Sequence, residues 1–291
     1  MQMKPLAGLL VVILGLSLTV RAAIPRTPQQ ASAVATMTVE FLDVGQGDAT
    51  LIRSPEGNTA LIDAGPPQDG FVALLKKHGV KQIDLLVTSH HHTDHIGNMA
   101  AVIEEFKPKA YLDSNSSHST KKYQGVLRAV AAARSEVINP YADKERRINL
   151  GSVLLRVFPQ PPEDEEDENN NSVGLRVEFG AFSALLTGDS REEERAWWLK
   201  NVDKGLYRKA TVLLLAQHGS IAGIDWEWLQ ETAPKVAVAS SGFGDKYGPH
   251  IRTIKMLARA KVNLLRTDRD GTITITSDGK DWKIAKEKSK D

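Results

Sequence analysis

The chain has 291 residues, in which 37 lysines and arginines nearly balance 36 aspartates and glutamates, and it contains no cysteine. The lack of cysteine excludes disulfides and thiolate zinc ligands, so any metal site must use nitrogen and oxygen ligands. The near-neutral charge excludes the basic signature of tight non-specific nucleic-acid binding, so a DNA or nucleotide substrate would have to be held locally.

The first residues of the chain predict export. Lys4 precedes an apolar core from Leu6 to Val20, and small residues follow, which is the pattern of a signal peptide over residues 1–23. An uncleaved membrane anchor is the alternative, because Arg21 is unfavourable near a cleavage site, although the apolar core is short for a span of about 20 residues. We therefore expect the protein in the periplasm or outside the cell, or anchored in the membrane if the signal stays attached.

A linker and then one large domain are expected next. Residues 24–35 hold two prolines and two glutamines and are expected to form an unstructured spacer. Residues 36–291 are enough for one domain with its own core. Three β-rich segments open this domain, at Met37–Leu42, Ala49–Arg53 and Thr59–Ile62.

A cluster of metal-binding residue types follows the apolar run Ile83–Val87, which predicts a strand, and precedes a helical pattern at Ile96–Phe106. The cluster consists of His90, His92, Asp94 and His95. Imidazole and carboxylate ligands suit Zn²⁺ and tolerate Mn²⁺. A loop between strand and helix can direct the first two at one cation and the last two at its neighbour. Cations about 3.5–4 Å apart can share a bridging hydroxide that acts as a nucleophile. A fortuitous histidine tract is the alternative.

This motif resembles the signature of the metallo-β-lactamase superfamily. Two further stretches, Asp43-Val-Gly-Gln-Gly-Asp48 and Leu61-Ile-Asp63-Ala-Gly65, resemble the start of the domain attached to the ComEC competence channel, and the resemblance covers roughly residues 37–275. It implies an α/β fold, the four-layer αββα sandwich, with two divalent cations, Zn or Mn. It also implies that Asp63 supports the metal loop by accepting a hydrogen bond, whereas a turn or helix-capping aspartate is the alternative. Asp43 and Asp48 are candidates for a similar supporting role or for the substrate pocket.

Six consecutive acidic residues occupy Glu163–Glu168, after a predicted strand at Val153–Phe158. Such a run is typical of a solvated loop, and its charge would hinder the approach of polyanions. The asparagine-serine pattern that follows resembles the ComEC group, in which it replaces a third histidine ligand. The resemblance implies that the amide oxygen of Asn169 can add to the first cation site. Asparagines that only form a turn are the alternative.

Two later strand ends are expected to complete the site. The strand Phe182–Thr187 is followed by a glycine and Asp189, and the glycine lets the backbone turn so that the carboxylate can bridge two cations, as the resemblance implies. The strand Thr211–Ala216 leads into Gln217-His218-Gly219-Ser220, which resembles the His-His-Gly-Ser motif of the ComEC group. His218 matches a ligand of the second cation, and Ser220 belongs to the expected pocket. Gln217 replaces a substrate-contacting histidine, and glutamine can donate a hydrogen bond but cannot supply a proton or a positive charge.

The polar loop at 241–250 resembles a Tyr-Gly-His-Pro segment of the same group with the proline and histidine exchanged. His250 is a candidate proton donor, and Lys246 is a candidate contact for an anion. Loop residues in water are the alternative for both. The last strand is predicted at Thr272–Thr276, and the basic tail from Lys280 is expected to fray.

These features favour an exported, standalone, dinuclear metal-dependent hydrolase that cleaves phosphodiesters, as a phosphodiesterase or nuclease acting on DNA or a nucleotide. Asp94, Asp189 and His250 are the predicted catalytic residues, acting with the bridging hydroxide. One alternative is the same site acting on a carbonyl, as a lactonase or β-lactamase, and another is a metal-stabilised binding protein without activity. No obligate protein partner is evident from the sequence, which leaves the oligomeric state open.

Overall fold

The computed structural model describes residues 1–2, 35–117, 119–244 and 248–288, and it divides the chain into the units Met1–Val34 and Ala35–Asp291. The expected signal peptide and linker fall almost entirely on residues 3–34, so they lie outside the described residues, as does Lys246. Among the helices of the described part, none combines the length and the apolar character that crossing a membrane requires.

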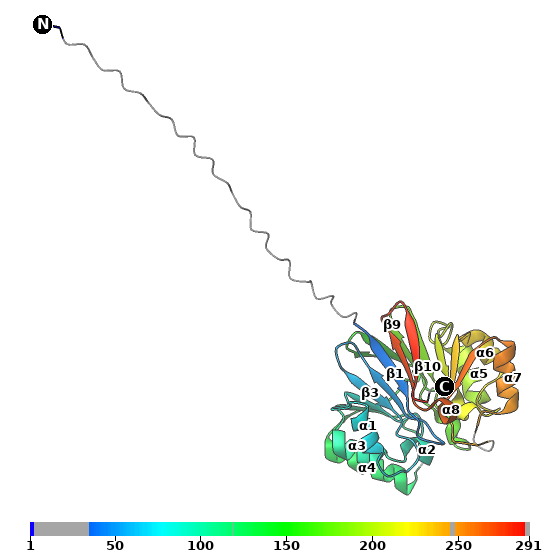
Figure 1. Cartoon of the computed structure of the whole chain (residues 1–291). Helices are drawn as coiled ribbons and strands as arrows, with labels where there is room; N and C mark the ends of the chain where they lie inside the picture. Colours follow the sequence, from blue (N-terminus) through cyan, green and yellow to red (C-terminus); the bar gives the residue numbers. More distant parts are fainter. Residues whose placement is uncertain (3–34, 118, 245–247, 289–291) are drawn as a thin grey trace. The chain divides into compact units, whose positions relative to one another are not determined.

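Two sheets build the second unit (Figure 1). The strands of the first sheet are, in spatial order, β15 (Trp282–Lys286), β14 (Ile273–Ser277), β1 (Met37–Phe41), β2 (Thr50–Arg53), β3 (Thr59–Ile62), β4 (Leu85–Val87), β5 (Ala110–Leu112) and β6 (Glu136–Ile138). Those of the second sheet are β13 (Asn263–Arg266), β12 (Val236–Ala239), β11 (Val212–Leu214), β10 (Phe182–Leu186), β9 (Leu175–Phe179), β8 (Val153–Val157) and β7 (Arg146–Leu150). Both sheets mix parallel and antiparallel pairs.

Helices cover the outer face of each sheet. The first set is α1 (Phe71–Lys77), α2 (Thr93–Ile96), α3 (Met99–Phe106) and α4 (Lys121–Ala133). The second set is α5 (Glu192–Asn201), α6 (Trp226–Thr232), α7 (Ile251–Arg259) and the short α8 (Thr267–Asp270), with the 3₁₀ turns η1 (Glu168–Asn171) and η2 (Ala216–Gly219). The result is the expected four-layer αββα sandwich (Figure 1).

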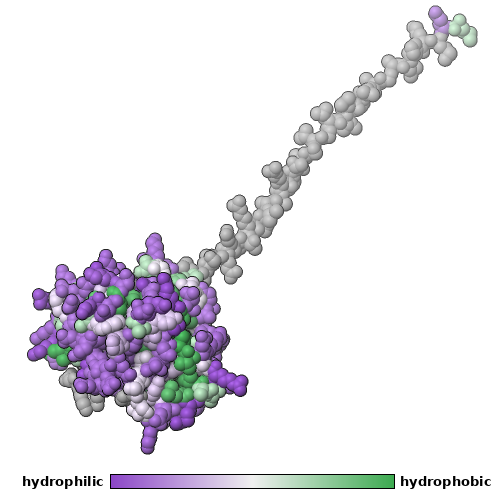
Figure 2. All heavy atoms as spheres, turned by 180° about the vertical axis from the view of Figure 1, so that it is seen from behind, coloured by the Kyte–Doolittle hydropathy of each residue, from purple (hydrophilic) through white to green (hydrophobic). Residues whose placement is uncertain are grey.

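Strand alternation explains the layers. Successive side chains of a strand point to opposite faces of the sheet. In β2, Ile52 joins the central apolar cluster between the two sheets, whereas Leu51 joins a second cluster beneath α1, α3 and α4. A third cluster, which includes Trp198 and Trp228, fills the space between the second sheet and its helices. Because these clusters hold most of the large apolar side chains, the face shown in Figure 2 is mostly hydrophilic, with a few small apolar areas.

Two expectations about elements are wrong. The tail from Lys280 does not fray at once, because β15 pairs along β14 from Trp282 to Lys286 and packs Trp282 and Ile284 against the central cluster. The helix expected at Ile96–Phe106 is two helices, α2 and α3, that are separated at residues 97–98. Helix α2 therefore begins earlier than expected and includes two of the metal-binding residue types.

Candidate metal centre

Parallel strands bring the centre together. In the first sheet β3 and β4 run parallel, with Asp63 directly after β3 and His90 shortly after β4. In the second sheet β10 and β11 run parallel, and Asp189 and His218 follow them. Gly188 has a φ of +50°, and a side chain there would collide with the loop that carries the histidines. Since the carboxyl ends of parallel strands meet at one edge of a sheet, the two edges place these side chains together.

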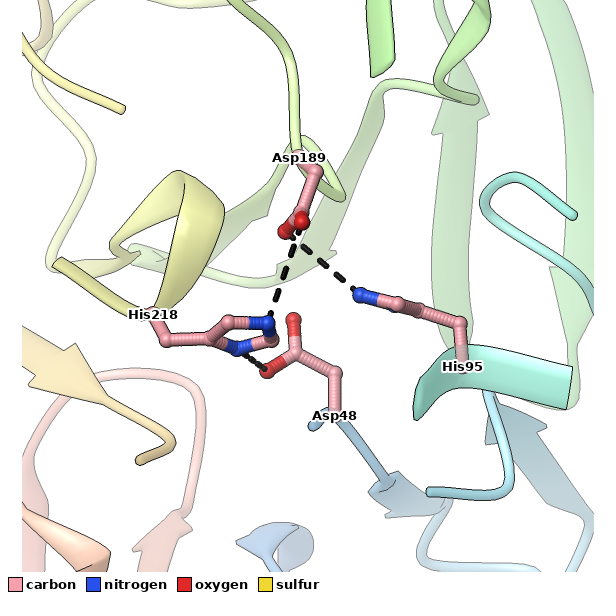
Figure 3. Close-up of side chains that lie close together, drawn as sticks. All are labelled: Asp48, His95, Asp189 and His218. Carbon is pink, nitrogen blue, oxygen red and sulfur yellow. Dashed lines mark hydrogen bonds and ion pairs between the residues drawn. The ribbon is translucent and has the colours of Figure 1, made fainter. Parts of the chain in front are cut away.

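Four buried residues form a group that fits a cation: Asp48, His95, Asp189 and His218. Each offers one nitrogen or oxygen atom, and these atoms all lie within 4.8 Å of one another. Figure 3 shows the four side chains reaching toward a common centre from separate segments of the chain. The sequence analysis gave Asp48 as a supporting or substrate-pocket residue, and the structure places it among the candidate ligands.

Asp189 lies between two sets of imidazoles. Its Oδ2 atom lies 4.0 Å from His90 Nε2 and 3.7 Å from His218 Nε2, and its Oδ1 atom lies 3.5 Å from His95 Nε2. His90 Nε2 in turn lies 3.1 Å from His92 Nδ1. The carboxylate thus faces one pair of histidines from each predicted cation site, which is the position that a bridging ligand requires.

Buried carboxylates orient the histidines. His95 Nδ1 donates to Asp63 Oδ2 at 2.8 Å, which directs His95 Nε2 toward Asp189. The backbone amide and the hydroxyl of Ser89 donate to the same carboxylate at 2.8 and 2.7 Å. A histidine ligand that donates its other ring N–H to a carboxylate has its tautomer and ring orientation fixed. His218 Nε2 lies 3.2 Å from Asp94 Oδ2, so the last histidine reaches the motif of the first half.

Burial and charge shift the pKa values at the centre. Burial opposes protonation of His218, but Asp189 and its neighbouring carboxylates outweigh this effect and raise the pKa to about 10. Burial also favours the neutral form of Asp94, yet the hydrogen bond from His218 and the charge of His95 lower its pKa to about 2. Burial and the nearby His95 hold the pKa of His90 well below its usual range. His90 is therefore a neutral imidazole at neutral pH, whereas a cation at His218 must displace a proton.

The middle histidine of the run points elsewhere. His91 is buried and donates from Nε2 to Asp113 Oδ1 at 2.7 Å, and its Nδ1 atom lies 3.2 Å from Glu168 Oε1. Its ring stacks on Tyr123 with centroids 3.6 Å apart. The sequence did not identify this network, because Asp113 and Glu168 are distant from His91 along the chain. The network anchors the loop from which His90 and His92 extend.

Gln217 and His218 have a strained backbone, with φ values of +47° and +56°. Such left-handed conformations of residues other than glycine are concentrated at functional sites. Here the conformation lets the backbone amide of Gln217 donate to Asp189 Oδ1 at 2.9 Å. The Ser220 hydroxyl donates to the side-chain oxygen of Gln217 at 3.0 Å.

Three other predicted residues have partners away from the four-residue group. Asp43 pairs with Lys288 at 2.7 Å. The exposed His250 precedes α7 and caps its N-terminus, because its Nδ1 atom accepts a hydrogen bond from the Arg252 amide. Asn169 is buried and donates from its side-chain amide to Asp167 at 2.7 Å. The proton-donor role of His250 and the ligand role of Asn169 stay predictions.

An acidic pocket adjoins His92. It has a volume of about 200 Å³ and is lined by His92, Ser117 and all six residues of Glu163–Glu168. Glu163, Glu165 and Glu166 are exposed there, whereas Glu168 is buried in the His91 network. The expected solvated acidic loop therefore borders the centre, where its negative potential acts on any approaching substrate.

The donor set fits divalent cations. Two buried polar atoms, His95 Nε2 and Asp48 Oδ2, have no hydrogen-bond partner among the described residues. Buried polar atoms without a partner are rare in proteins, and a bound ion is one common explanation. Neutral imidazoles and carboxylates are the ligands that Zn²⁺ and Mn²⁺ accept.

Comparisons with known proteins support the resemblance that the sequence motifs indicated. A family model described as the metallo-beta-lactamase superfamily matches residues 42–222. The chain is similar to ComE operon protein 3 of Bacillus subtilis, with 30% identity over 81% of the chain and 32% of that protein. It is equally similar to competence protein ComA of Neisseria gonorrhoeae, with 30% identity over 81% of the chain and 31% of that protein. The chain thus spans about a third of the length of these curated relatives.

Solved structures show the same fold. The metallo-beta-lactamase fold protein YhfI of Bacillus subtilis aligns with a TM-score of 0.57 at 13% identity, over 84% of this chain and all of that one. Igni18, a metallo hydrolase of the archaeon Ignicoccus hospitalis, aligns with a TM-score of 0.51 at 15% identity, over 81% of this chain and 98% of that one. The resemblance that the sequence motifs predicted, and the fold that it implied, are confirmed.

Proposed function

The chain belongs to the metallo-β-lactamase superfamily, and from this premise we propose that it is an exported hydrolase that uses two divalent cations, Zn or Mn, to cleave phosphodiesters. The observation that carries the proposal is the position of Asp189 between the His90–His92 pair and the His95–His218 pair. Similarity to two competence proteins supports a phosphodiester substrate, DNA or a nucleotide among them. The sequence of residues 1–23 supports export.

Each residue of the centre has a defined task in this proposal. His90 and His92 would hold the first cation, Asp94, His95 and His218 would hold the second, and Asp189 would contact both. When bound, such a pair of cations activates water and stabilises the negative charge that develops on the substrate.

Neighbouring residues position these ligands and the substrate. Asp63 fixes the orientation of His95. The Gln217 backbone amide fixes Asp189, while Ser220 orients the Gln217 side chain so that its NH₂ group can donate to a substrate oxygen. A glutamine there contributes no positive charge, so charge stabilisation depends on the cations.

The acidic pocket favours a second candidate. Six carboxylates beside His92 repel long polyanions, whereas a small or uncharged ester meets no such barrier. Hydrolysis of a carbonyl substrate, such as a lactone or β-lactam, is therefore the alternative that the site supports.

The test compares four substrates: bis(p-nitrophenyl) phosphate, linear DNA, a lactone and the β-lactam nitrocefin. The proteins are the wild type, Asp189→Ala, and the control Asp281→Asn, which changes an exposed aspartate in the turn before β15. We expect the wild type and the control to cleave the phosphodiester and Asp189→Ala to lose at least a hundredfold in rate, on the scale of about 2.7 kcal/mol or more for removing charge stabilisation. Cleavage of the lactone or nitrocefin alone would replace the proposal with the carbonyl candidate. Metal binding without any hydrolysis would favour a binding protein.

A further inference from the structure

Two buried aspartates contact histidines of the centre, but they differ in what their second oxygen does. Asp63 uses both oxygens, because Ser89 and His95 donate to them at 2.7–2.8 Å. Asp48 places Oδ1 at 3.2 Å from His218 Nδ1, whereas its Oδ2 atom is buried without a hydrogen-bond partner among the described residues. Only 2% of Asp48 is exposed, so water does not readily satisfy this oxygen.

The loop that carries Asp48 is held from both halves of the sandwich. The Asp48 amide donates to the Asp94 carbonyl at 3.3 Å, and the Gly65 amide donates to the Asp48 carbonyl at 2.9 Å. From the second half, the Ser240 hydroxyl donates to the Gly47 carbonyl at 2.7 Å. The carboxylate is therefore fixed in the interior and faces the other ligands, as Figure 3 shows.

The distances suit a shared cation. Two ligands of Zn²⁺ that each lie about 2.1 Å from the ion are at most about 4.2 Å apart. The candidate atoms of Asp48, His95, Asp189 and His218 already lie within 4.8 Å of one another. Contraction by roughly 0.6 Å, the difference between these two values, is enough to place all four around one ion.

We propose that Asp48 is a direct ligand of the second cation through its Oδ2 atom, in addition to Asp94, His95, Asp189 and His218. This inference rests on the proposed metal centre but not on the proposed substrate. Three carboxylates and two imidazoles then surround the second cation, whereas His90, His92 and the shared Asp189 hold the first. More anionic ligands bind a divalent cation more tightly, so the second site fills first.

The additional carboxylate also sets metal preference. Carboxylate oxygens suit Mn²⁺ better than imidazoles do. An added carboxylate therefore reduces the difference in affinity by which a nitrogen-rich site prefers Zn²⁺ to Mn²⁺. Loss of the Asp48 carboxylate should therefore weaken Mn²⁺ binding more than Zn²⁺ binding. Loss of a carboxylate that only orients a histidine should weaken both to a similar extent.

The experiment titrates the metal-free full chain with Zn²⁺ and, separately, with Mn²⁺ by calorimetry. The variants are Asp48→Asn and the matched control Asp63→Asn, which retain similar shape and an oxygen that can accept from the histidine. In Asp48→Asn we expect the affinity of the tightest metal-binding step to fall by more than about 100-fold, and to fall further for Mn²⁺ than for Zn²⁺. Asp63→Asn should lower the affinity for both metals by about 10–100-fold, by a similar factor for each, as expected for a residue that acts through a ligand.

A crystal structure of the wild type with Zn²⁺, which uses the anomalous signal of zinc, provides a readout that does not depend on variant folding or on activity. We expect an Asp48 oxygen at about 2.0–2.2 Å from the second zinc. A distance above about 3 Å between the Asp48 oxygens and the second zinc would show that Asp48 only orients His218. Equal losses of affinity for the two metals in both variants would show the same. Either result is independent of which ester the protein cleaves.

Discussion

Replacing His91 with leucine tests whether the middle histidine of the motif acts by anchoring its neighbours. The substitution removes the donor at 2.7 Å from Asp113 and the ring contact at 3.2 Å from Glu168, and it leaves both carboxylates buried. Removing one partner of a buried charged pair typically costs about 3–5 kcal/mol. The remaining partners reduce this cost, since Asp113 still accepts from the hydroxyls of Tyr111 and Tyr123 at 2.9 Å.

We therefore expect the metal-free His91→Leu protein to lose about 2–3 kcal/mol of unfolding free energy, which lies below the full cost of an unpaired buried charge. For a domain of this size the loss corresponds to a Tm decrease of roughly 5–10 °C. Because His90 and His92 extend from the same loop, affinity for the first cation should also fall by about 10–100-fold, the usual effect of residues that support metal ligands.

Urea unfolding with a chelator gives the stability, and calorimetric titration with Zn²⁺ gives the affinity. The control is His78→Leu, which removes an imidazole 2.7 Å from Glu40 outside the metal loop. This control should lose stability but bind both cations as the wild type does. Wild-type stability and wild-type affinity in His91→Leu would refute the anchoring role of His91.

Three further predictions concern packing, protons and substrate charge. Gly97→Ala should lower the free energy of unfolding by about 1–3 kcal/mol in urea, because the added Cβ would lie 2.3–2.5 Å from backbone atoms of residues 65–67. In the control Gly125→Ala the Cβ approaches one flexible side-chain atom at 3.8 Å, so this variant should keep or gain stability. Equal losses in the two variants would contradict this steric reasoning. Burial opposes protonation of His218 and His95, but nearby carboxylates raise the pKa of His218 to about 10 and hold the pKa of His95 well above its usual range. Zn²⁺ binding at pH 7.5 should therefore release about two protons from these imidazoles, and the affinity should rise as pH rises toward 10. Calorimetry in buffers of different ionisation enthalpy measures this release, and its absence would show that both histidines are neutral before binding. Neutralising the exposed glutamates of the loop Glu163–Glu168 should lower KM for DNA several-fold at low salt and leave KM for bis(p-nitrophenyl) phosphate unchanged. The effect on DNA should fade as added salt screens the charges. An equal change in KM for both substrates would contradict electrostatic exclusion.

The proximity of the four motif residues could be predicted from the sequence because they are close neighbours along the chain. His90, His92, Asp94 and His95 lie within six positions after a strand, so their convergence follows from one loop and the start of one helix. The position of Asp189 at a strand end could be predicted because a strand pattern and a glycine precede it, and its role as a ligand stays a prediction. Its distance from the histidines, however, depends on how the two sheets pack.

Contacts between distant segments could not be predicted in the same way. The approach of Asp48 to His218 joins residues 170 positions apart, and His91 meets Glu168 across 77 positions. Strand β15 was missed because it is short and lies in a lysine-rich tail, although Trp282 and Ile284 alternate with lysines and pack against the central cluster. Helix α5 was missed as well, because it begins with three glutamates and has no clear apolar stripe.

The most direct test of the central claim is metal analysis of the purified full chain after exposure to Zn²⁺ and, separately, to Mn²⁺, for the wild type and Asp189→Ala. A carboxylate that holds two cations predicts about two metal ions per wild-type chain and no more than about one per variant chain. A wild-type chain that retains neither metal would contradict the dinuclear centre and the hydrolase proposed from it.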